Sequence, residues 1–287
     1  GWSEFSPFTE YPDAEAATWL RAAIEFGWTD PPSPLRETIG VNATLPAVGP
    51  ERVAAVLEPF GACRTVKVKV AERGQSRADD VARVRAAREY VGPEGRVRLD
   101  ANGAWGVDEA EGAIHALAEF DLEYVEQPCA TISELAQLRR RIKHLGVPIA
   151  ADESVRKADD PLAVARSGAA DLLVIKAQPL GGIRSALHIV KEAGLPVVVS
   201  SALDSSVGIA MGAHLAAAVP ELDFDCGLGT AALLAADITR QPLTPVDGEI
   251  LVRRVDVDDT LLDEFAAPPD RHAWWRERLK RCHALLD

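Results

Sequence analysis

The chain has 287 residues, with 31 Lys and Arg against 44 Asp and Glu, which gives a formal net charge of −13. This acidic balance argues against a surface for DNA or RNA phosphates and against a polybasic membrane patch. No apolar run approaches the ~18 residues that a membrane span needs, and a hydrophobic content of 47% is ordinary for a globular protein. The length fits either two medium-sized domains or one barrel with an addition.

The first segment combines an aromatic, strand-like run over Gly1–Phe8 with a helical pattern over Ala14–Phe26. A proline-rich stretch, Pro31–Pro34, separates it from the middle of the chain. The first residue is Gly rather than Met, and no charged-then-apolar leader comes after it. We therefore expect that further sequence precedes this segment in the gene or has been trimmed from it.

The middle of the chain alternates short apolar runs with helical patterns. The polar residues that close these runs are spaced by 24 to 31 residues, and they are Asn42, Lys69, Asp100, Glu126, Asp152, Lys176, Ser200 and Asp225. The helical patterns cover Arg77–Tyr90, Val107–Phe120, Thr131–Leu145, Pro161–Ser167, Gly182–Ala193 and Val207–Ala218. Eight strand–helix units of this length predict a closed (β/α) barrel. An open doubly wound sheet is the alternative, but the sequence has no GxGxxG turn to support it.

The last segment holds an alternating run, Ile250–Val257, and a Trp-rich helical pattern around Trp274 and Trp275. Both ends of the chain thus lie outside the region in which apolar runs recur every 24 to 31 residues. We expect an α/β protein in which residues 1–32 are the remnant of a capping domain, residues 33–242 are the catalytic barrel, and residues 243–287 complete the cap.

The spacing of the cysteines and histidines limits the kinds of thiol and metal site that the sequence predicts. The four cysteines form no CxxC pair, which favours reduced thiols in a cytoplasmic protein. The six histidines show neither HxH nor HExxH spacing. Any metal ion is therefore expected to be held by oxygen ligands.

Two lysines lie in the second apolar run, at Lys67 and Lys69. With a period of two, the intervening valines face the helices and both lysines point into the barrel. Buried lysines are costly unless they are paired or functional. The alternative register, which turns both lysines to solvent, is compatible with this run alone.

The next three runs each end in a carboxylate, at Asp100, Glu126 and Asp152. Neighbouring strands lie about 4.7–4.9 Å apart, so three inward carboxylates on adjacent strand ends can meet at one cation. All-oxygen ligation with open positions favours Mg²⁺ over Ca²⁺. Taken singly, Asp100 could instead cap the next helix, and Glu126 could pair with a lysine.

Lys176 closes the sixth run and should face Lys69 across the barrel mouth, because the second and sixth positions of an eight-membered ring are opposed. Two amines on either side of a metal site suit the removal of a proton next to a carboxylate, with the metal stabilising the enediolate.

The ordered set of these lysines and carboxylates resembles the muconate-lactonizing subgroup of the enolase superfamily, over essentially the whole chain. Within that subgroup, four segments are similar to the o-succinylbenzoate synthase family: Gly1–Phe8, Asn42–Ala47, Ser200–Ser206 and Cys226–Thr230.

The resemblance implies a hydro-lyase that converts 2-succinyl-6-hydroxy-2,4-cyclohexadiene-1-carboxylate into o-succinylbenzoate in menaquinone biosynthesis. It implies Mg²⁺ as cofactor, replaceable by Mn²⁺, a small carboxylate as substrate, and neither nucleic acid nor membrane as partner. Lys69 would remove the proton and assist the departure of hydroxide, Lys176 would face the delocalised intermediate, and Lys67 would assist Lys69 and contact the carboxylate. Substrate contacts would come from Ser200, Ser201, Gly227, Gly229 and Asn102. The resemblance also implies a longer N-terminal stretch with a mobile, substrate-selecting loop, most of which this chain is expected to lack.

Three alternatives stay open at this stage. An N-succinylamino acid racemase or a dipeptide epimerase would carry the same motif set. A noncatalytic barrel that binds a metal or a carboxylate would be expected to have lost one of the six key residues, and a structural protein would need a large apolar or charged surface. The sequence does not indicate an oligomeric state.

Overall fold

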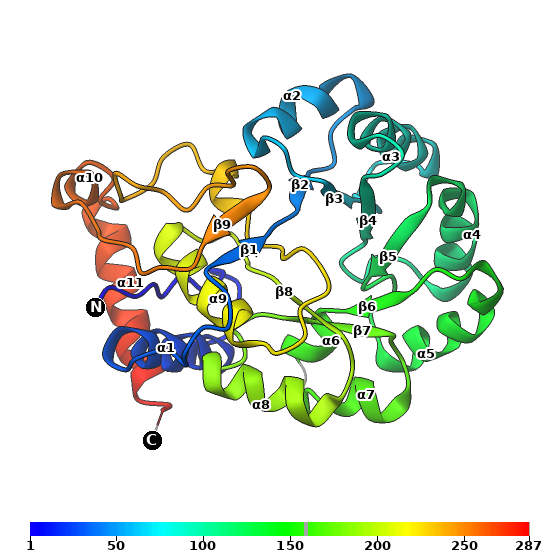
Figure 1. Cartoon of the computed structure of the whole chain (residues 1–287). Coiled ribbons are helices and arrows are strands. Elements are labelled where there is room, and N and C mark those ends of the chain that lie inside the picture. The colour runs from blue at the N-terminus through cyan, green and yellow to red at the C-terminus, as the bar shows by residue number, and fades with distance from the viewer. Residues whose placement is uncertain (158–159, 287) are drawn as a thin grey trace.

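Short parallel strands form the central sheet of the protein, which the computed structural model describes over residues 1–157 and 160–286. Within those residues the strand order in the sheet follows the chain, and each neighbouring pair is parallel. The strands are β2 (Ala43–Leu45), β3 (Thr65–Lys69), β4 (Arg96–Asp100), β5 (Leu122–Glu126), β6 (Ile149–Ala151), β7 (Leu172–Ile175) and β8 (Val197–Val199). The sheet curls strongly, and the helices lie outside it (Figure 1). The predicted α/β barrel is therefore confirmed.

The two edges of the sheet are joined by a pair of residues rather than by a full eighth strand. The amide of Cys226 donates to the carbonyl of Gly40 (2.7 Å), and the amide of Gly227 donates to that of Val199 (2.8 Å). Isolated parallel bridges connect the same segment to residues on both edges. These contacts close the ring.

The first and eighth predicted runs are wrong in register. Asn42 lies between the bridged residue Val41 and β2, and Asp225 precedes the bridged residue Cys226, so neither of them ends a strand. The reason is Arg98, whose Nη1 donates to the Asn42 side chain (3.1 Å) and to the Asp225 carbonyl (2.6 Å). Since Arg98 lies two residues before Asp100 on β4, these partners sit one layer below the mouth of the ring.

Helices follow most strands on the outside of the ring. They are α2 (Val53–Leu57), α3 (Arg77–Val91), α4 (Val107–Leu117), α5 (Ile132–Arg141), α6 (Glu153–Arg156), α7 (Ala163–Ser167), α8 (Ile183–Ala193) and α9 (Ser206–Ala218). Short 3₁₀ turns are η1 (Pro50–Arg52), η2 (Glu58–Phe60), η3 (Ala118–Phe120), η4 (Lys143–Leu145) and η5 (Thr230–Leu233). Capping boxes start two of the helices, Ser76 with Asp79 at α3 and Thr131 with Glu134 at α5. The predicted helical patterns therefore match helices within a few residues at their ends.

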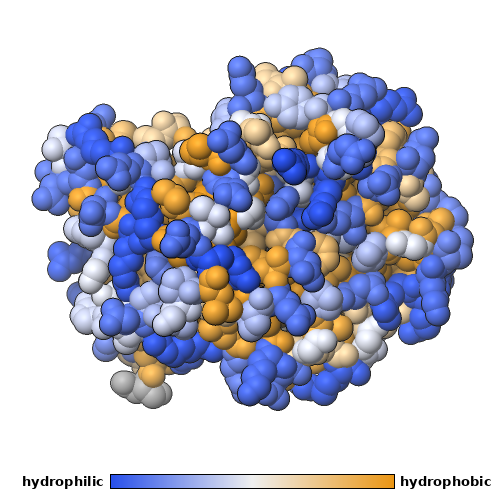
Figure 2. All heavy atoms as spheres, in the orientation of Figure 1, coloured by the Kyte–Doolittle hydropathy of each residue, from blue (hydrophilic) through white to orange (hydrophobic). Residues whose placement is uncertain are grey.

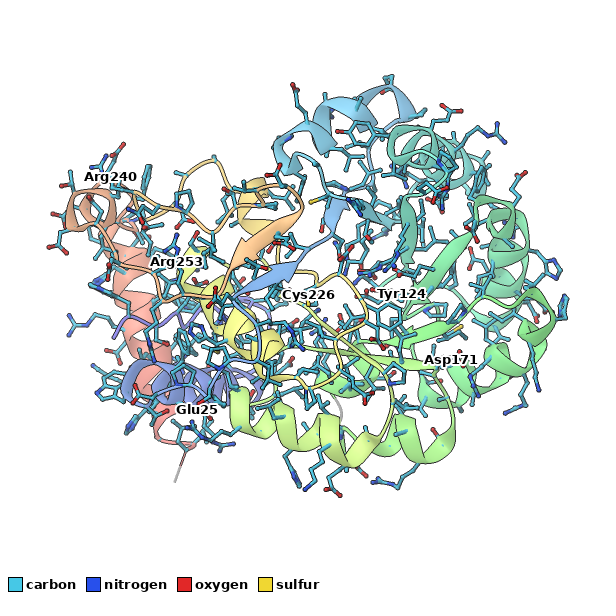
Figure 3. The ribbon with its side chains drawn as sticks, viewed as in Figure 1. Glu25, Tyr124, Asp171, Cys226, Arg240 and Arg253 are labelled. Carbon is cyan, nitrogen blue, oxygen red and sulfur yellow. The ribbon has the colours of Figure 1, made fainter. Side chains whose placement is uncertain are left out.

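The strands separate two apolar cores. The larger core lies between the ring and the outer helices and includes Val66, Val68 and Ile175. A smaller core fills the ring itself, with Tyr124, Ala150, Leu172, Val174 and Val198; Tyr124 is labelled in Figure 3. Burial on both faces explains why the strands read as nearly continuous apolar runs.

The two ends of the chain pack together beside the ring. Helix α1 (Asp13–Trp28) contacts α11 (Pro269–His283), and both termini lie on that side of the molecule (Figure 1). Strand β1 (Thr38–Gly40) pairs antiparallel with β9 (Glu249–Leu251), and α10 (Asp259–Glu264) precedes α11.

The alternating run predicted over Ile250–Val257 forms only this short strand, and the strand-like run Gly1–Phe8 forms none within the described residues. The latter run bonds through side chains instead: the Glu4 carboxylate accepts from backbone amides at the start of α9.

The exposed surface is predominantly hydrophilic on the face shown in Figure 2, with apolar side chains between the charged ones. Over the described residues, the helices are all too short or too polar to cross a membrane.

Candidate active site

The charged residues predicted from the strand ends gather at the carboxyl end of the ring. Three of them lie two residues beyond a member of the inner core: Glu126 follows Tyr124, Asp152 follows Ala150, and Lys176 follows Val174. The set comprises Lys67, Lys69, Asp100, Glu126, Asp152 and Lys176. All of them are buried except Lys69, whose side chain is 31% exposed. The solvent-facing register of the lysine run is therefore wrong.

Lys67 lies between two of the carboxylates. Its Nζ donates to both carboxylate oxygens of Glu126 (3.0 and 3.1 Å) and lies 3.2 Å from Asp100 Oδ2. Strand pairing sets these contacts, since Asp100 is opposite Glu126 in the β4–β5 register. Lys67 thus neutralises a pair of acids that would otherwise repel each other.

Lys69 lies nearer the opening. Its Nζ donates to Asp100 Oδ2 (2.5 Å) and to Asn102 Oδ1 (3.0 Å). The Asn102 backbone has φ +47° and its amide donates to the other oxygen of Asp100 (3.1 Å). This tight turn after β4 brings Asn102 beside Lys69, where it is exposed to solvent.

Lys176 and Arg156 share the third carboxylate. Lys176 Nζ donates to Asp152 Oδ2 (2.6 Å), and Arg156 Nε donates to Asp152 Oδ1 (3.1 Å). The guanidinium also donates to Glu153 (2.7 Å) and to the hydroxyl of Tyr11 (3.0 Å). Asp152 is therefore held between a barrel lysine and an arginine that reaches the N-terminal segment.

Burial and mutual charge set the ionisation of this cluster. Burial would lower the pKa of Lys67, but Glu126 and Asp100 outweigh it and the pKa is raised. Burial is also the largest influence on the carboxyls, and it opposes ionisation. The lysines overcome it at Asp100 and Asp152, whose pKa values are lowered. At Glu126, burial and then the Asp100 charge raise the pKa to about 7.

Lys69 and Lys176 face each other across the opening. Lys69 ends β3 and Lys176 follows β7, and the strands β4, β5 and β6 that carry the acids lie between them on one side. On the other side lie β8, the closing residues and β2. Both lysines line one open cavity of about 260 Å³.

The structure places some, but not all, of the residues predicted to bind substrate at this cavity. Asn102, Ser200, Ser201 and Gly227 line the cavity, whereas Gly229 is outside its lining. Ser201 Oγ donates to the Gly227 carbonyl (2.7 Å), which fixes the hydroxyl at the cavity edge.

Sequence reasoning missed several residues of the cavity wall. Arg156 lies four residues after Asp152, a spacing that places both on one face of a helix and could have signalled the pair. Phe8 and Trp19 of the N-terminal segment are apolar residues of the wall, and so are Leu203 in the loop after β8 and Leu233 at the end of η5. Their approach to the barrel depends on tertiary contacts that no local pattern signals.

The carboxylates fit a divalent cation by chemistry, although they are turned toward the lysines. Over the described residues, no three His, Cys, Asp or Glu side chains are close enough together to hold a metal ion. The donor set is nevertheless made of three carboxylates, each 1% exposed, on neighbouring strand ends. Buried carboxylate oxygens on neighbouring strand ends suit a hard ion such as Mg²⁺.

Comparisons with known proteins agree with this geometry. Residues 51–255 match the family model "Enolase C-terminal domain-like", and residues 1–27 match "Enolase N-terminal domain-like". The solved structure of the muconate lactonizing enzyme from Pseudomonas putida superposes with a TM-score of 0.73 over 90% of this chain and 76% of its own, at 22% identity. That likeness concerns the fold.

Two curated relatives are much more similar in sequence. The o-succinylbenzoate synthase of Thermobifida fusca is 56% identical over the whole of this chain and 88% of its own length. The o-succinylbenzoate synthase of Mycobacterium tuberculosis strain H37Rv is 54% identical over the whole of this chain and 86% of its own length. The chain therefore belongs to the o-succinylbenzoate synthase family of the enolase superfamily.

Proposed function

We propose that the protein is a hydro-lyase that dehydrates 2-succinyl-6-hydroxy-2,4-cyclohexadiene-1-carboxylate to o-succinylbenzoate, a reaction of menaquinone biosynthesis. The observation that carries the proposal is identity of 54–56% over the whole chain to relatives of that name. The site supports it, because opposed lysines and three carboxylates line or underlie one cavity.

The reaction needs one proton removed and one hydroxide expelled. The C–H bond next to the ring carboxylate breaks, the C–O bond at the neighbouring ring carbon breaks, a C=C bond forms, and water leaves. Lys69 removes the proton and then returns it to the departing hydroxide from the same face. Its 31% exposure and its place at the cavity wall support this role, since a base must reach the proton it takes.

The other two lysines act as fixed cations. Lys176 presents its ammonium group to the delocalised intermediate from the opposite wall. Lys67, buried between Asp100 and Glu126, assists Lys69 through the Asp100 carboxylate that both lysines contact, and it also contacts the substrate carboxylate.

Members of the enolase superfamily use a divalent metal ion, typically Mg²⁺. In this chain Asp100, Glu126 and Asp152 would hold Mg²⁺, or Mn²⁺ in its place. The bound ion would stabilise the negative charge that develops on the substrate carboxylate.

Ser200, Ser201 and the backbone at Gly227 shape the succinyl end, and Asn102 holds Lys69 and contacts the ring side of the substrate.

We extend the proposal to the organisation of the protein. Residues 1–32 and 243–287 form the cap and residues 33–242 the catalytic barrel. The protein works in the cytoplasm on a small carboxylate and binds neither nucleic acid nor membrane.

Direct assay of the dehydration tests the proposal. Conversion of the cyclohexadiene to the aromatic product is followed by absorbance with Mg²⁺ present, then after a chelator is added. Turnover that requires the metal is expected. Absence of dehydration, together with α-proton exchange into N-succinylamino acids or dipeptides, would instead assign a racemase or an epimerase, and absence of both would favour a noncatalytic barrel.

A further inference from the structure

A second, smaller cavity lies behind Lys176, where the N-terminal segment meets the ends of β7 and β8. Its walls include Trp19 of α1, Gln178 after β7 and Asp204 after β8. Four of their side-chain atoms have no hydrogen-bond partner among the described residues: Trp19 Nε1, both amide atoms of Gln178 and Asp204 Oδ1. These side chains are buried, with exposed fractions of 1%, 5% and 3%.

Such atoms indicate a ligand, because a buried polar group without a hydrogen-bond partner destabilises the folded protein. Trp19 and the Gln178 amide nitrogen are donors, and the Gln178 and Asp204 oxygens are acceptors. Donors and acceptors together match the hydrogen-bonding capacity of water. The cavity leaves about 10 Å³ for the centre of a water-sized sphere, close to the ~10–15 Å³ that one water molecule needs.

The backbone of α9 leaves this space open at Gly208. A Cβ atom there would lie 2.8 Å from Asp204 Cβ, 2.9 Å from Gln178 Nε2 and 3.0 Å from Glu4 Cδ. The side chains of Glu4, Gln178 and Asp204 thus converge on a helix position that has no side chain of its own. A larger residue at Gly208 would close the space.

The two acids at this cavity favour water over a cation. Glu4 already accepts hydrogen bonds from the Ser205 and Gly208 amides and from two hydroxyl groups. Burial and then the Glu4 charge raise the pKa of Asp204 to about 8, against a smaller opposing effect of Lys176. Asp204 is therefore mainly a neutral acid at pH 7, and the site offers little charge to a metal ion.

Lys176 connects this cavity to the active site. Its side chain lines both cavities, and its ammonium group bonds to Asp152 on the active-site side. Gln178 is two residues further along the same loop, and Trp19 is also part of both walls. A molecule in the smaller cavity would therefore contact both Lys176 and Gln178.

We infer that this smaller cavity is a built water site that ties Trp19 of the N-terminal segment to Gln178 and Asp204, and that Gln178 is a positioning residue for Lys176. The water accepts from Trp19 Nε1 and from the Gln178 amide, and it bonds to Asp204 Oδ1. The positioning role rests on the proposed function, whereas the water site does not.

A high-resolution crystal structure of the protein tests the water site. An ordered water is expected about 2.7–3.2 Å from Trp19 Nε1, Gln178 and Asp204. Direct hydrogen bonds between Gln178 and Asp204 with no water between them would overturn the inference, and so would an empty cavity.

Gln178→Met tests the positioning role, because it removes both amide atoms at similar volume. Its crystal structure should lack the water and show Lys176 Nζ displaced from Asp152. Since a misplacement of ~1 Å can cost about 100-fold in rate, we expect kcat to fall about 10- to 100-fold with little change in KM. The matched control Gln137→Met, on the outer helix α5, should change neither quantity.

Unchanged kcat and an unmoved Lys176 in Gln178→Met would refute the positioning role. If that variant does not fold, Trp19→Phe removes the indole donor together with part of the ring volume, and the same two measurements are made on it. If the wild-type protein does not dehydrate the cyclohexadiene, the proposed function fails, but the water and the Lys176–Asp152 separation are still read from the crystal structures.

Discussion

Replacing Lys69 separates catalysis from folding more sharply than any other single change in the site. Lys69→Ala removes one of the two ammonium groups at Asp100 Oδ2, the one at 2.5 Å, and leaves Lys67 at 3.2 Å. Asp100 therefore keeps a cationic partner, and the carboxylate does not become an isolated buried charge. The expected loss of stability is therefore that of one charge-assisted hydrogen bond made by a partly exposed lysine.

The expected losses of stability and of turnover in Lys69→Ala differ greatly in size. A hydrogen bond to a charged group contributes about 1.5–3 kcal/mol, and the partial exposure of Lys69 places the cost at about 1–2 kcal/mol. Proteins have roughly 5–15 kcal/mol of stability, so the variant should fold. A general acid or base contributes about 10²–10⁴-fold to a rate. Because Lys69 serves in both proton transfers, we expect turnover to fall at least ~10⁴-fold, or about 5.5 kcal/mol in activation free energy.

The assay compares Lys69→Ala with Lys69→Arg and with a control, Lys143→Ala, on the exposed turn η4. Dehydration is followed by absorbance, stability by urea unfolding, and Mg²⁺ binding by calorimetry. Arginine keeps the charge beside Asp100 but does not release a proton near neutral pH. Both Lys69 variants should therefore lose turnover and still bind Mg²⁺, and the control should behave as wild type. Turnover within about tenfold of wild type in Lys69→Arg would refute Lys69 as the base.

Three further predictions concern the metal, the buried acid and the ring closure. Asp152→Asn should weaken Mg²⁺ binding in calorimetry, and an unchanged Mg²⁺ requirement for turnover would contradict the ligand role. The pKa of Asp204, raised to about 8 by burial and by Glu4, means that the folded protein keeps a proton that the unfolded chain releases above about pH 4. The free energy of unfolding should therefore fall between about pH 4 and 8, by up to ~1.4 kcal/mol per pH unit. Urea unfolding measured across that pH range should show a flatter slope for Asp204→Asn than for the wild type. An identical slope in both proteins would exclude Asp204 as its source. Gly229→Ala would bring a Cβ to 2.9 Å from the Asn42 carbonyl oxygen and should lower the free energy of unfolding by about 1–3 kcal/mol, whereas unchanged stability would show that the backbone can relax there.

The sequence predicted the barrel and the inward direction of its charged residues because both depend on local periodicity. A strand alternates its faces every residue, so Lys67 and Lys69 share a face whatever surrounds them. Strand order followed from chain order, which placed Lys69 and Lys176 on opposite arcs. Local signals also located helix starts, such as the capping box at Thr131.

Pairing partners and register at the ring closure required the tertiary structure. Asn42 and Asp225 look like strand ends, but Arg98 on a central strand holds both of them one layer lower. The N-terminal aromatic run has the composition of a strand, yet its Glu4 bonds to Ser205, 201 residues away.

What the amino-acid sequence determined by itself is the chemistry at the mouth of the ring: lysines and carboxylates at fixed positions on successive inward-facing strand ends. Only the tertiary structure decided which groups neutralise each other, that Arg156 reaches Asp152 and Tyr11, and that Trp19, Gln178 and Asp204 line a polar cavity behind Lys176. The physical reason is how far apart along the chain the interacting residues lie. Side-chain direction is set by neighbours along the chain, whereas burial, charge pairing and unsatisfied hydrogen bonds depend on segments that meet only when the chain is folded.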